Sequence, residues 1–245
     1  MIKAVLFDLD ETLLDLNLDA YVRAFTMQRI RLLARISRKL SVAIAAPWCR
    51  TYVGMLSDRD DDLTNAQFLE RRFGELSGIP LGDPAIASCL DYYDREFFNP
   101  EMAASSAVRG RPRVGGLACL EACERLGVAV ALATNPTFPR SCTEERMRWA
   151  GVDGYPFVCV TSLENSTRTK PWDRYYREVC TAVGAEPHEC LMVGNDAKYD
   201  FPSRGLGLRT CYVGPGRDER ACWNGTMESL ALALPRLVES GTSSN

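Results

Sequence analysis

Four short groups of polar residues have side-chain types and spacings that could support chemistry on a charged substrate. In chain order they are Asp8 and Asp10, then Thr134 and Asn135, then Lys170, and finally Asn195, Asp196 and Asp200. Each group follows a short apolar run of the kind that forms a buried strand. Open parallel sheets bind their ligands outside the carboxyl ends of the strands. We therefore expect the four groups to meet at one edge of a sheet.

The first group places two carboxylates two residues apart, directly after the apolar run 4–7. In extended backbone Asp8 and Asp10 point to the same side, so both can face one site. Two adjacent negative charges are unfavourable unless a cation or a shared proton relieves them. Mg²⁺, a hard cation with oxygen ligands, would do so. On these residues alone, the alternative is an acidic helix cap with Thr12 at the start of a helix.

The second and third groups offer hydrogen-bond donors and a positive charge. The hydroxyl of Thr134 and the amide of Asn135 could donate to a phosphoryl oxygen, and Pro136 suits a turn leading away. Lys170 precedes a predicted helix, from which its amine could neutralise a phosphate and its nucleophile. A capped turn and an isolated surface lysine are the structural alternatives.

The fourth group follows the apolar run 191–193 and combines an amide with carboxylates. Asn195 and Asp196 are adjacent, and Asp200 lies four residues beyond Asp196. Such oxygen ligands suit Mg²⁺, which usually keeps several waters and takes few protein ligands. For these residues taken alone, an acidic turn with a helix cap is the alternative.

Five short, almost wholly apolar runs recur along the chain, as in strands that are covered on both faces. They are residues 4–7, 128–133, 157–160, 191–193 and 211–213. Helical patterns lie between them, at 117–126 and 172–183, and these end at Gly127 and Gly184. The alternation predicts an α/β fold in which helices cover both faces of a doubly wound parallel sheet.

A long segment from residue 16 to residue 108 interrupts this alternation. It has helical patterns at 20–40, 65–76 and 85–98 and no convincing strand. About ninety residues are far too many for an ordinary loop, so we expect a separate helical module inserted after the first strand. The expected division is an α/β core of residues 1–15 and 109–245 and a helical module of residues 16–108.

The order of the four groups resembles the haloacid dehalogenase (HAD) superfamily. Its signatures are Asp-x-Asp-x-Thr, a Ser or Thr after the second strand, a Lys, and an acidic loop of the Gly-Asp type. Residues 8–12 match the first signature, which is highly specific, and the match covers residues 1–15 and 113–213. The helical module looks like the family's cap. The resemblance implies a Rossmann-like core and a magnesium-dependent phosphohydrolase that acts on a small phosphorylated metabolite.

The resemblance also implies roles for individual residues. Asp8 would attack phosphorus to form an aspartyl-phosphate, and Asp10 would protonate the leaving oxygen and then activate water. Thr134 and Asn135 would hold the phosphoryl oxygens, while Lys170 would offset negative charge. The expected magnesium ligands are Asp8, the backbone carbonyl of Asp10 and either Asn195 or Asp196, and Asp200 would either bind the ion directly or support a residue that does.

One departure from the family pattern is Asn195, because members commonly carry Asp at this position. The amide favours a rival in which the protein binds phosphate and regulates without turnover. A dehalogenase is disfavoured by Asp10, which the metal-independent dehalogenases of this superfamily generally lack. A phosphonatase would need an imine-forming lysine in the cap, where Lys39 is the only lysine. A phosphomutase would use the same residues and stays open.

Composition sets further limits on partners and location. The chain has 245 residues and a formal net charge of -3, so no overall positive field would attract nucleic acid. No apolar run approaches the roughly 20 residues that span a bilayer, so we expect a cytoplasmic protein without membrane contact. The ten cysteines lack Cys-x-x-Cys spacing, which favours buried free thiols. The cap could offer a homodimer surface, and residues 240–245 read as a loose tail.

Two charged stretches and the single histidine are expected to face solvent. The basic residues between 23 and 39, Arg29 among them, alternate with apolar ones as on an amphipathic helix. The acidic run 58–62 and His188 are expected in exposed connectors.

Overall fold

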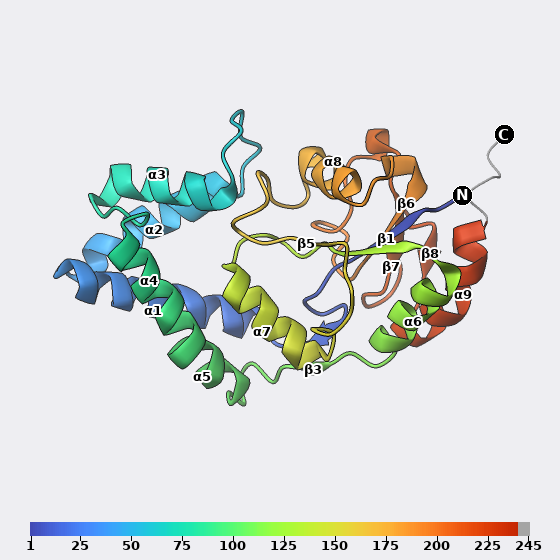
Figure 1. Cartoon of the computed structure of the whole chain (residues 1–245), viewed down its shortest axis with the longest axis horizontal. Coiled ribbons are helices and arrows are strands. Elements are labelled where there is room, and N and C mark those ends of the chain that lie inside the picture. Colours follow the sequence, from blue (N-terminus) through green and yellow to red (C-terminus); the bar gives the residue numbers. More distant parts are fainter. Residues whose placement is uncertain (240–245) are drawn as a thin grey trace.

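The computed structural model describes residues 1–239. A parallel sheet with flanking helices occupies one end of an elongated molecule, and a group of helices occupies the other (Figure 1). The predicted tail at 240–245, and with it the end of the predicted core, lies outside the described residues.

The sheet is built from the apolar runs of the sequence. Its strands, in spatial order, are β5 (Cys159–Val160), β4 (Ala129–Leu132), β1 (Ala4–Phe7), β6 (Cys190–Gly194), β7 (Arg209–Tyr212) and β8 (Trp223–Asn224). Every pairing between these neighbours is parallel. From β1 the chain passes outward through β4 and β5, and then returns to the other side of β1 with β6. The sheet is therefore doubly wound, as predicted, and its winding reverses beside β1.

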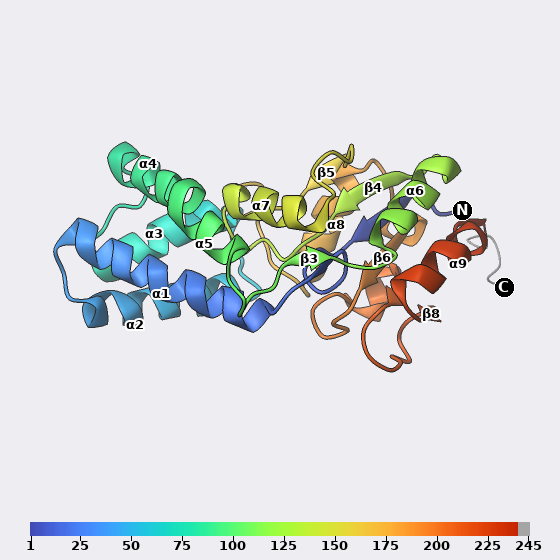
Figure 2. The ribbon, with the colours of Figure 1, turned by 90° about the horizontal axis from the view of Figure 1, so that it is seen from below.

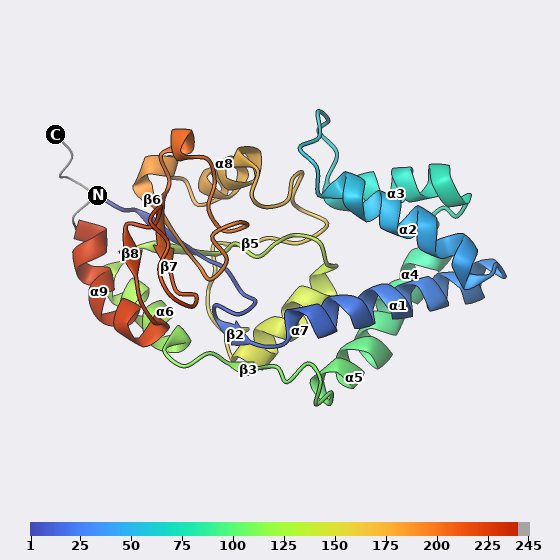
Figure 3. The same ribbon diagram turned by 180° about the vertical axis from the view of Figure 1, so that it is seen from behind.

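Helices cover both faces of the sheet, so β1 is buried from both sides. Val5 and Phe7 pack into one hydrophobic cluster with α6 (Gly116–Leu126) and α9 (Met227–Glu239), while Ala4 and Leu6 pack into another with α8 (Asp173–Ala182). Figures 1 and 3 show α8 on one side of the strands and α6 with α9 on the other. Burial on both faces explains the unbroken apolar sequence of the central strands.

The segment predicted as a helical module does form helices. They are α1 (Leu18–Ser37), α2 (Ser41–Met55), α3 (Asn65–Ser77), α4 (Pro84–Tyr93), a π-helical turn (Asp94–Phe98) and α5 (Asn99–Ala103). Figure 2 shows them gathered together at the end of the molecule away from the sheet, and we call this group the helical half. A division into two domains at residues 16 and 108 stays a prediction.

Two short strands mark where the chain enters and leaves the helical half. β2 (Leu14–Asp15) pairs antiparallel with β3 (Arg111–Pro112), so the two crossings run side by side. An ion pair of 2.7 Å between Arg111 Nη2 and Asp15 Oδ2 reinforces the ladder. Figure 3 shows β2 and β3 at the boundary between the helical half and the sheet.

Some elements differ from the predicted ones. The sequence patterns do not predict α2, because Pro47 interrupts a run that nevertheless continues as a helix. They also do not predict α7 (Arg140–Ala150) or α9. The strand expected at 157–160 is reduced to the two residues of β5 at the edge of the sheet.

Arg29, expected on a solvated helix face, is buried instead. Its Nη2 donates to both carboxylate oxygens of Asp94, at 2.8 and 2.7 Å, which satisfies the charge inside the helical half. All ten cysteines are free, and six of them are buried, as the sequence predicted for most of them. Within residues 1–239 no helix is long and apolar enough to cross a membrane.

Candidate active site

Asp8 extends the central strand into the site. Its backbone N–H donates to the Val193 carbonyl at 2.9 Å, which continues the pairing of β1 with β6. Asp8 is only 6% exposed, and its Oδ1 accepts a hydrogen bond from Lys170 Nζ at 2.7 Å. The same Nζ donates to Asp200 Oδ1 at 2.6 Å. One buried ammonium group therefore bridges two buried carboxylates that follow different strands.

Burial and charge act on these three groups in opposite directions. Burial raises the pKa of Asp8, Lys170 lowers it and Asp10 raises it, with an upward net change. Burial raises the pKa of Asp200 to about 6, against the lowering effect of Lys170. Burial alone would lower the pKa of Lys170, but Asp200 and Asp8 raise it above its usual value. The lysine therefore stays protonated at neutral pH, and two carboxylates share its charge.

Asp10 has a cation of its own. Arg146, from α7, is fully buried and donates through Nη1 to Asp10 Oδ2. The other oxygen, Asp10 Oδ1, is buried and has no hydrogen-bond partner. Sequence reasoning missed Arg146, although a signal was present. It shares helical spacing with Cys142 and Ala150 on the buried face of α7, where a charged residue needs a partner.

A tight turn after Asp10 meets the fourth group. Glu11 adopts a positive φ of 60°. The Thr12 hydroxyl donates to Asn195 Oδ1 at 3.0 Å, and Asn195 Nδ2 donates to Glu11 Oε2 at 3.2 Å. The first group is not a helix cap, because α1 starts later in the chain and Asn17 caps it. Asn195 is thus placed against the first group.

The fourth group divides between the site and solvent. Asp200 is buried, and its Oδ2 accepts a hydrogen bond from the Asp196 N–H at 2.9 Å. The Asp196 side chain is exposed, and its Oδ1 accepts from the Lys198 N–H at 2.8 Å. Gly194 is required at the end of β6, because a Cβ there would lie 2.3 Å from Asp200 Cγ. Asn195 and Asp200 thus contact other site residues, whereas the Asp196 carboxylate is directed to the surface.

The second group supplies a buried hydroxyl beyond β4. Thr134 is 1% exposed, and its Oγ1 has no hydrogen-bond partner. Its carbonyl accepts hydrogen bonds from Tyr175 Oη at 2.8 Å and Thr161 Oγ1 at 2.7 Å, which fix the backbone. Asn135 Oδ1 accepts from the Lys170 N–H at 3.3 Å and so links the second and third groups. Buried polar groups are rarely left unpaired, so the Thr134 hydroxyl is a candidate contact for a ligand.

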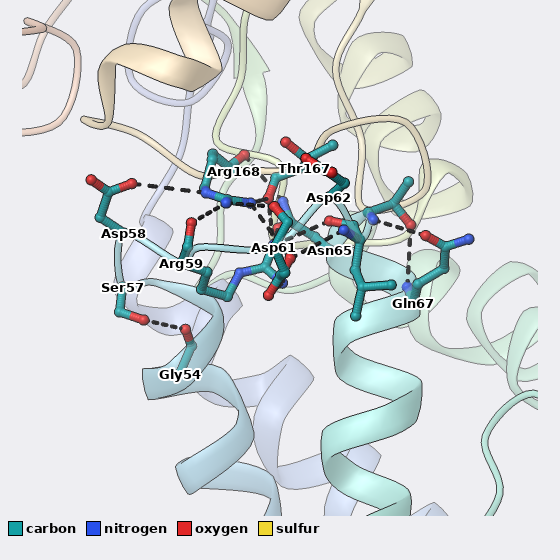
Figure 4. A network of polar contacts seen from close by, with 12 residues as sticks. Gly54, Ser57, Asp58, Arg59, Asp61, Asp62, Asn65, Gln67, Thr167 and Arg168 are labelled. Carbon is teal, nitrogen blue, oxygen red and sulfur yellow. Dashed lines mark hydrogen bonds and ion pairs between the residues drawn. The ribbon is translucent and has the colours of Figure 1, made fainter.

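The helical half reaches the site through a clasp formed by Arg59, Asn65 and Arg168 (Figure 4). Asn65, at the start of α3, donates through Nδ2 to the carbonyls of Pro136 at 3.1 Å and Arg168 at 3.2 Å. Arg59 Nη2 donates to Asn65 Oδ1 at 2.9 Å, and Arg168 Nη2 donates to the Arg59 carbonyl. The run 58–62 was expected in solvent, but it docks on the sheet half through its buried arginine.

The clasp holds loops that carry the second and third groups. Arg168 precedes Lys170 by two residues. Tyr52 of α2 adds a hydrogen bond of 2.8 Å to the carbonyl of Thr137, two residues after Asn135. The helical half therefore contacts the same backbone segments that position the candidate catalytic side chains.

The buried groups of the site carry a net negative charge. Asp8, Asp10 and Asp200 are opposed by Lys170 and Arg146. A bound phosphate would add negative charge, which a cation could offset. Within residues 1–239, no group of three or more His, Cys, Asp or Glu side chains forms a ready metal cage. The oxygen donors that are present, the Asp8 carboxylate and the Asn195 amide, are of the type that Mg²⁺ takes, and Mg²⁺ completes its shell with waters and substrate oxygens.

Comparison with known families agrees with this geometry. A family model for haloacid dehalogenase-like hydrolases matches residues 2–203. The chain belongs to the haloacid dehalogenase-like hydrolases. The match includes all four groups and the helical half, so the resemblance and the fold class predicted from the sequence are confirmed.

Solved structures of HAD proteins share this fold over nearly the whole chain. A HAD phosphatase from Thermococcus onnurineus is 18% identical, with a TM-score of 0.54 over 95% of this chain and 98% of that one. CbbY from Rhodobacter sphaeroides, in complex with phosphate, is 19% identical, with a TM-score of 0.55 over 94% and 96%. YfnB from Bacillus subtilis, bound to magnesium, is 19% identical, with a TM-score of 0.51 over 97% and 99%. At these identities the likeness concerns the fold. No curated protein matches the sequence.

Proposed function

We propose that this HAD hydrolase is a magnesium-dependent phosphatase that acts on a small phosphorylated metabolite through an aspartyl-phosphate. One observation carries the proposal: the Lys170 ammonium joins the carboxylates of Asp8 and Asp200 in a buried site. The unpaired hydroxyl of Thr134 follows the neighbouring strand β4. The arrangement supplies a nucleophile, a neutralising cation and a donor for a phosphoryl oxygen.

Asp8 suits the nucleophile's role. The end of β1 and Lys170 hold its carboxylate in place, so little orientation has to be gained during reaction. A bond forms between an Asp8 oxygen and phosphorus as the bond to the leaving oxygen breaks. Water then cleaves the aspartyl-phosphate and releases inorganic phosphate. Asp200 acts through Lys170 and does not contact phosphorus itself. Its Oδ1 accepts a hydrogen bond from Lys170 Nζ, and its Oδ2 accepts one from a backbone N–H.

Phosphoryl oxygens would meet a hydroxyl donor and a positive charge. Thr134 contributes its free hydroxyl, and Lys170 contributes charge from the neighbouring loop, which is hydrogen-bonded to Asn135. Mg²⁺ bound by Asp8, the Asp10 carbonyl and Asn195 would supply charge to stabilise the phosphoryl group in its transition state. An amide oxygen at Asn195 is a neutral ligand, so this site would hold the ion with less negative charge than a carboxylate set. Asp200 would then support the site through Lys170.

The rival reactions are less well supported. A phosphonatase would need an imine-forming lysine directed at Asp8. Lys39 is instead exposed, and its Nζ donates to the Ser77 carbonyl at 2.5 Å. A cavity of about 280 Å³ lies where the helical half meets the core, and Phe25, Trp48 and Leu163 are among its mainly apolar lining. None of the candidate site residues lines this cavity, so it does not identify the leaving group.

The first experiment measures hydrolysis of p-nitrophenyl phosphate with Mg²⁺ and with EDTA, by the wild type and by Asp8→Asn. We expect turnover that requires metal and is abolished by the substitution. Asp196→Asn is the matched control, because that carboxylate is exposed, and we expect it to keep most of the activity. If the wild type fails with this ester and with a broad panel of phosphate esters, the hydrolase proposal is wrong.

A further inference from the structure

Arg146 is enclosed by groups from both halves of the molecule. Its guanidinium carbon lies 4.6 Å from the ring centroid of Phe138 and 5.1 Å from that of Tyr21, which belongs to α1. Its Nε donates to the Cys142 carbonyl at 3.3 Å. These contacts fix the plane of the guanidinium, and Nη1 is left to bind Asp10 Oδ2. A planar group packed against two aromatic rings, with one of its nitrogens bound to a backbone carbonyl, can fix the orientation of the carboxylate that it contacts.

The two oxygens of Asp10 are thereby made different. Oδ2 is bound by Arg146, whereas Oδ1 is buried without a partner. Lys170 is committed to Asp8 and Asp200, so the nucleophile and Asp10 are each oriented by a different cation. This separation allows one carboxylate to attack while the other transfers a proton.

We propose that Arg146 is a positioning residue that presents Oδ1 of Asp10 to the leaving oxygen of the substrate. The inference rests on the proposed phosphatase function. In the first step the proton on Asp10 Oδ1 passes to the leaving oxygen, as its bond to phosphorus breaks and the bond from Asp8 forms. In the second step Oδ1 takes a proton from water, as the water oxygen bonds to phosphorus and the bond to Asp8 breaks. The guanidinium holds the Asp10 carboxylate in place between the two steps.

The role predicts a dependence on the leaving group. An alkyl alcohol leaves poorly without a proton, whereas p-nitrophenolate is stable as an anion and needs little help. We expect Arg146→Met to lower kcat/KM for an alkyl phosphate by about a hundredfold or more, and for p-nitrophenyl phosphate by less than about tenfold. A residue that only supports the fold would lower both values by one common factor.

The matched control is Arg29→Met, which removes the arginine of another buried ion pair, the one with Asp94. We expect it to change both esters by the same factor. Arg146→Lys carries the test if Arg146→Met does not fold, because it keeps the charge and loses the planar fork. In the Asp10→Asn background, Arg146→Met should add no further leaving-group dependence.

Equal losses on the two esters in both Arg146 variants would overturn the role of Arg146 and leave the phosphatase proposal standing. A gain in kcat/KM for the alkyl ester would also overturn it, since Arg146 would then be holding Asp10 away from the substrate. Failure of the wild type on both esters and on the broad panel of phosphate esters would overturn the phosphatase proposal and, with it, this inference.

Discussion

Lys170 is the residue on which the electrostatics of the site depends most. It is buried, it contacts two carboxylates, and its own pKa is raised by them despite the opposing effect of burial. Breaking a buried ion pair from one side costs much more than removing both partners, because a charge is left uncompensated. Removal of the amine would therefore leave Asp8 and Asp200 facing each other without the cation that they share.

The stability cost of Lys170→Met should depend on pH. Because the folded pKa of Lys170 is raised, its contribution is fully present below the unfolded lysine pKa of 10.5 and is lost only as pH rises through the folded value. On the acid side, the Asp200 carboxylate, with a pKa of about 6, becomes protonated, and the ion pair weakens. We expect a loss of about 3–5 kcal/mol at pH 7.5 and a smaller loss at pH 5. Urea unfolding in EDTA would measure both, and a loss that grows toward pH 5 would contradict the argument.

Thr134→Val tests the free hydroxyl. The substitution keeps the shape of the side chain and removes a group that has no protein partner, so stability should hardly change. We expect kcat/KM for p-nitrophenyl phosphate to fall by about 10²–10³, as for the loss of one preorganised donor. Thr51→Val is the control: its hydroxyl donates to the Pro47 carbonyl inside α2, so it should affect stability and spare activity. Full activity of Thr134→Val would remove this residue from the site.

Most residues of the candidate site could be proposed from the sequence because they follow buried strands in a characteristic order. Asp8, Thr134 and Lys170 are candidates on this basis, and the structure links the loops that carry them. Arg146 is not a candidate on this basis, because it belongs to a helix that follows a loop, and its partner lies 136 positions away in the chain. Sequence spacing also could not decide that Asp196 faces outward, since that depends on the hydrogen bonds of one turn.

The elements of the sheet were predictable, whereas the loops that fasten the helical half were not. Strands that are buried on both faces have unbroken apolar sequences, whereas a loop that packs on another part of the protein has no repeating pattern of apolar residues from which it could be predicted. The clasp shows the difference. Asn65 looks like an ordinary residue at the start of a helix, yet its side chain connects α3 to two loops of the site.

Asn65→Leu should disconnect this contact. The carbonyls of Pro136 and Arg168 would lose a buried donor, at a cost of about 2 kcal/mol in the free energy of unfolding. Activity should fall as well, because the same loops position the phosphate-binding groups. The control is Gln67→Leu, which removes the exposed capping box of α3 without touching the clasp. Urea unfolding and kcat/KM should be measured for both variants. If Asn65→Leu is as active as the control, the clasp does not support catalysis.

At the scale of the whole molecule, one hydrophobic cluster runs from the helical half into the sheet half. Tyr21 and Phe25 of α1 have ring centroids 5.2 and 5.0 Å from that of Phe138, in edge-on packing. The same cluster includes Trp48 in α2 and Val5 in β1. Residues far apart in the chain therefore share one buried surface, and the two halves have reason to unfold together.

Variants that retain a single tryptophan can test this cooperativity. Trp48 reports on the helical half and Trp223 on the edge of the sheet. We expect equal urea midpoints for the two reporters, and we expect Phe138→Ala to lower both midpoints together through a loss of about 3–5 kcal/mol. Two separated midpoints would show that the halves unfold independently.

The ladder of β2 and β3 has a consequence for how such a protein can change over evolution. The whole segment between these two strands is one long insertion in the sheet half, and the pairing of β2 with β3 holds its two ends next to each other. The entropic cost of bringing the two ends of such an insertion together grows only with the logarithm of its length. Segments of very different size could therefore be exchanged at this point while the strand ends that bear Asp8 and Asp10 stay in place. The limit on such grafts is the apolar face around Phe138, which any replacement would have to cover.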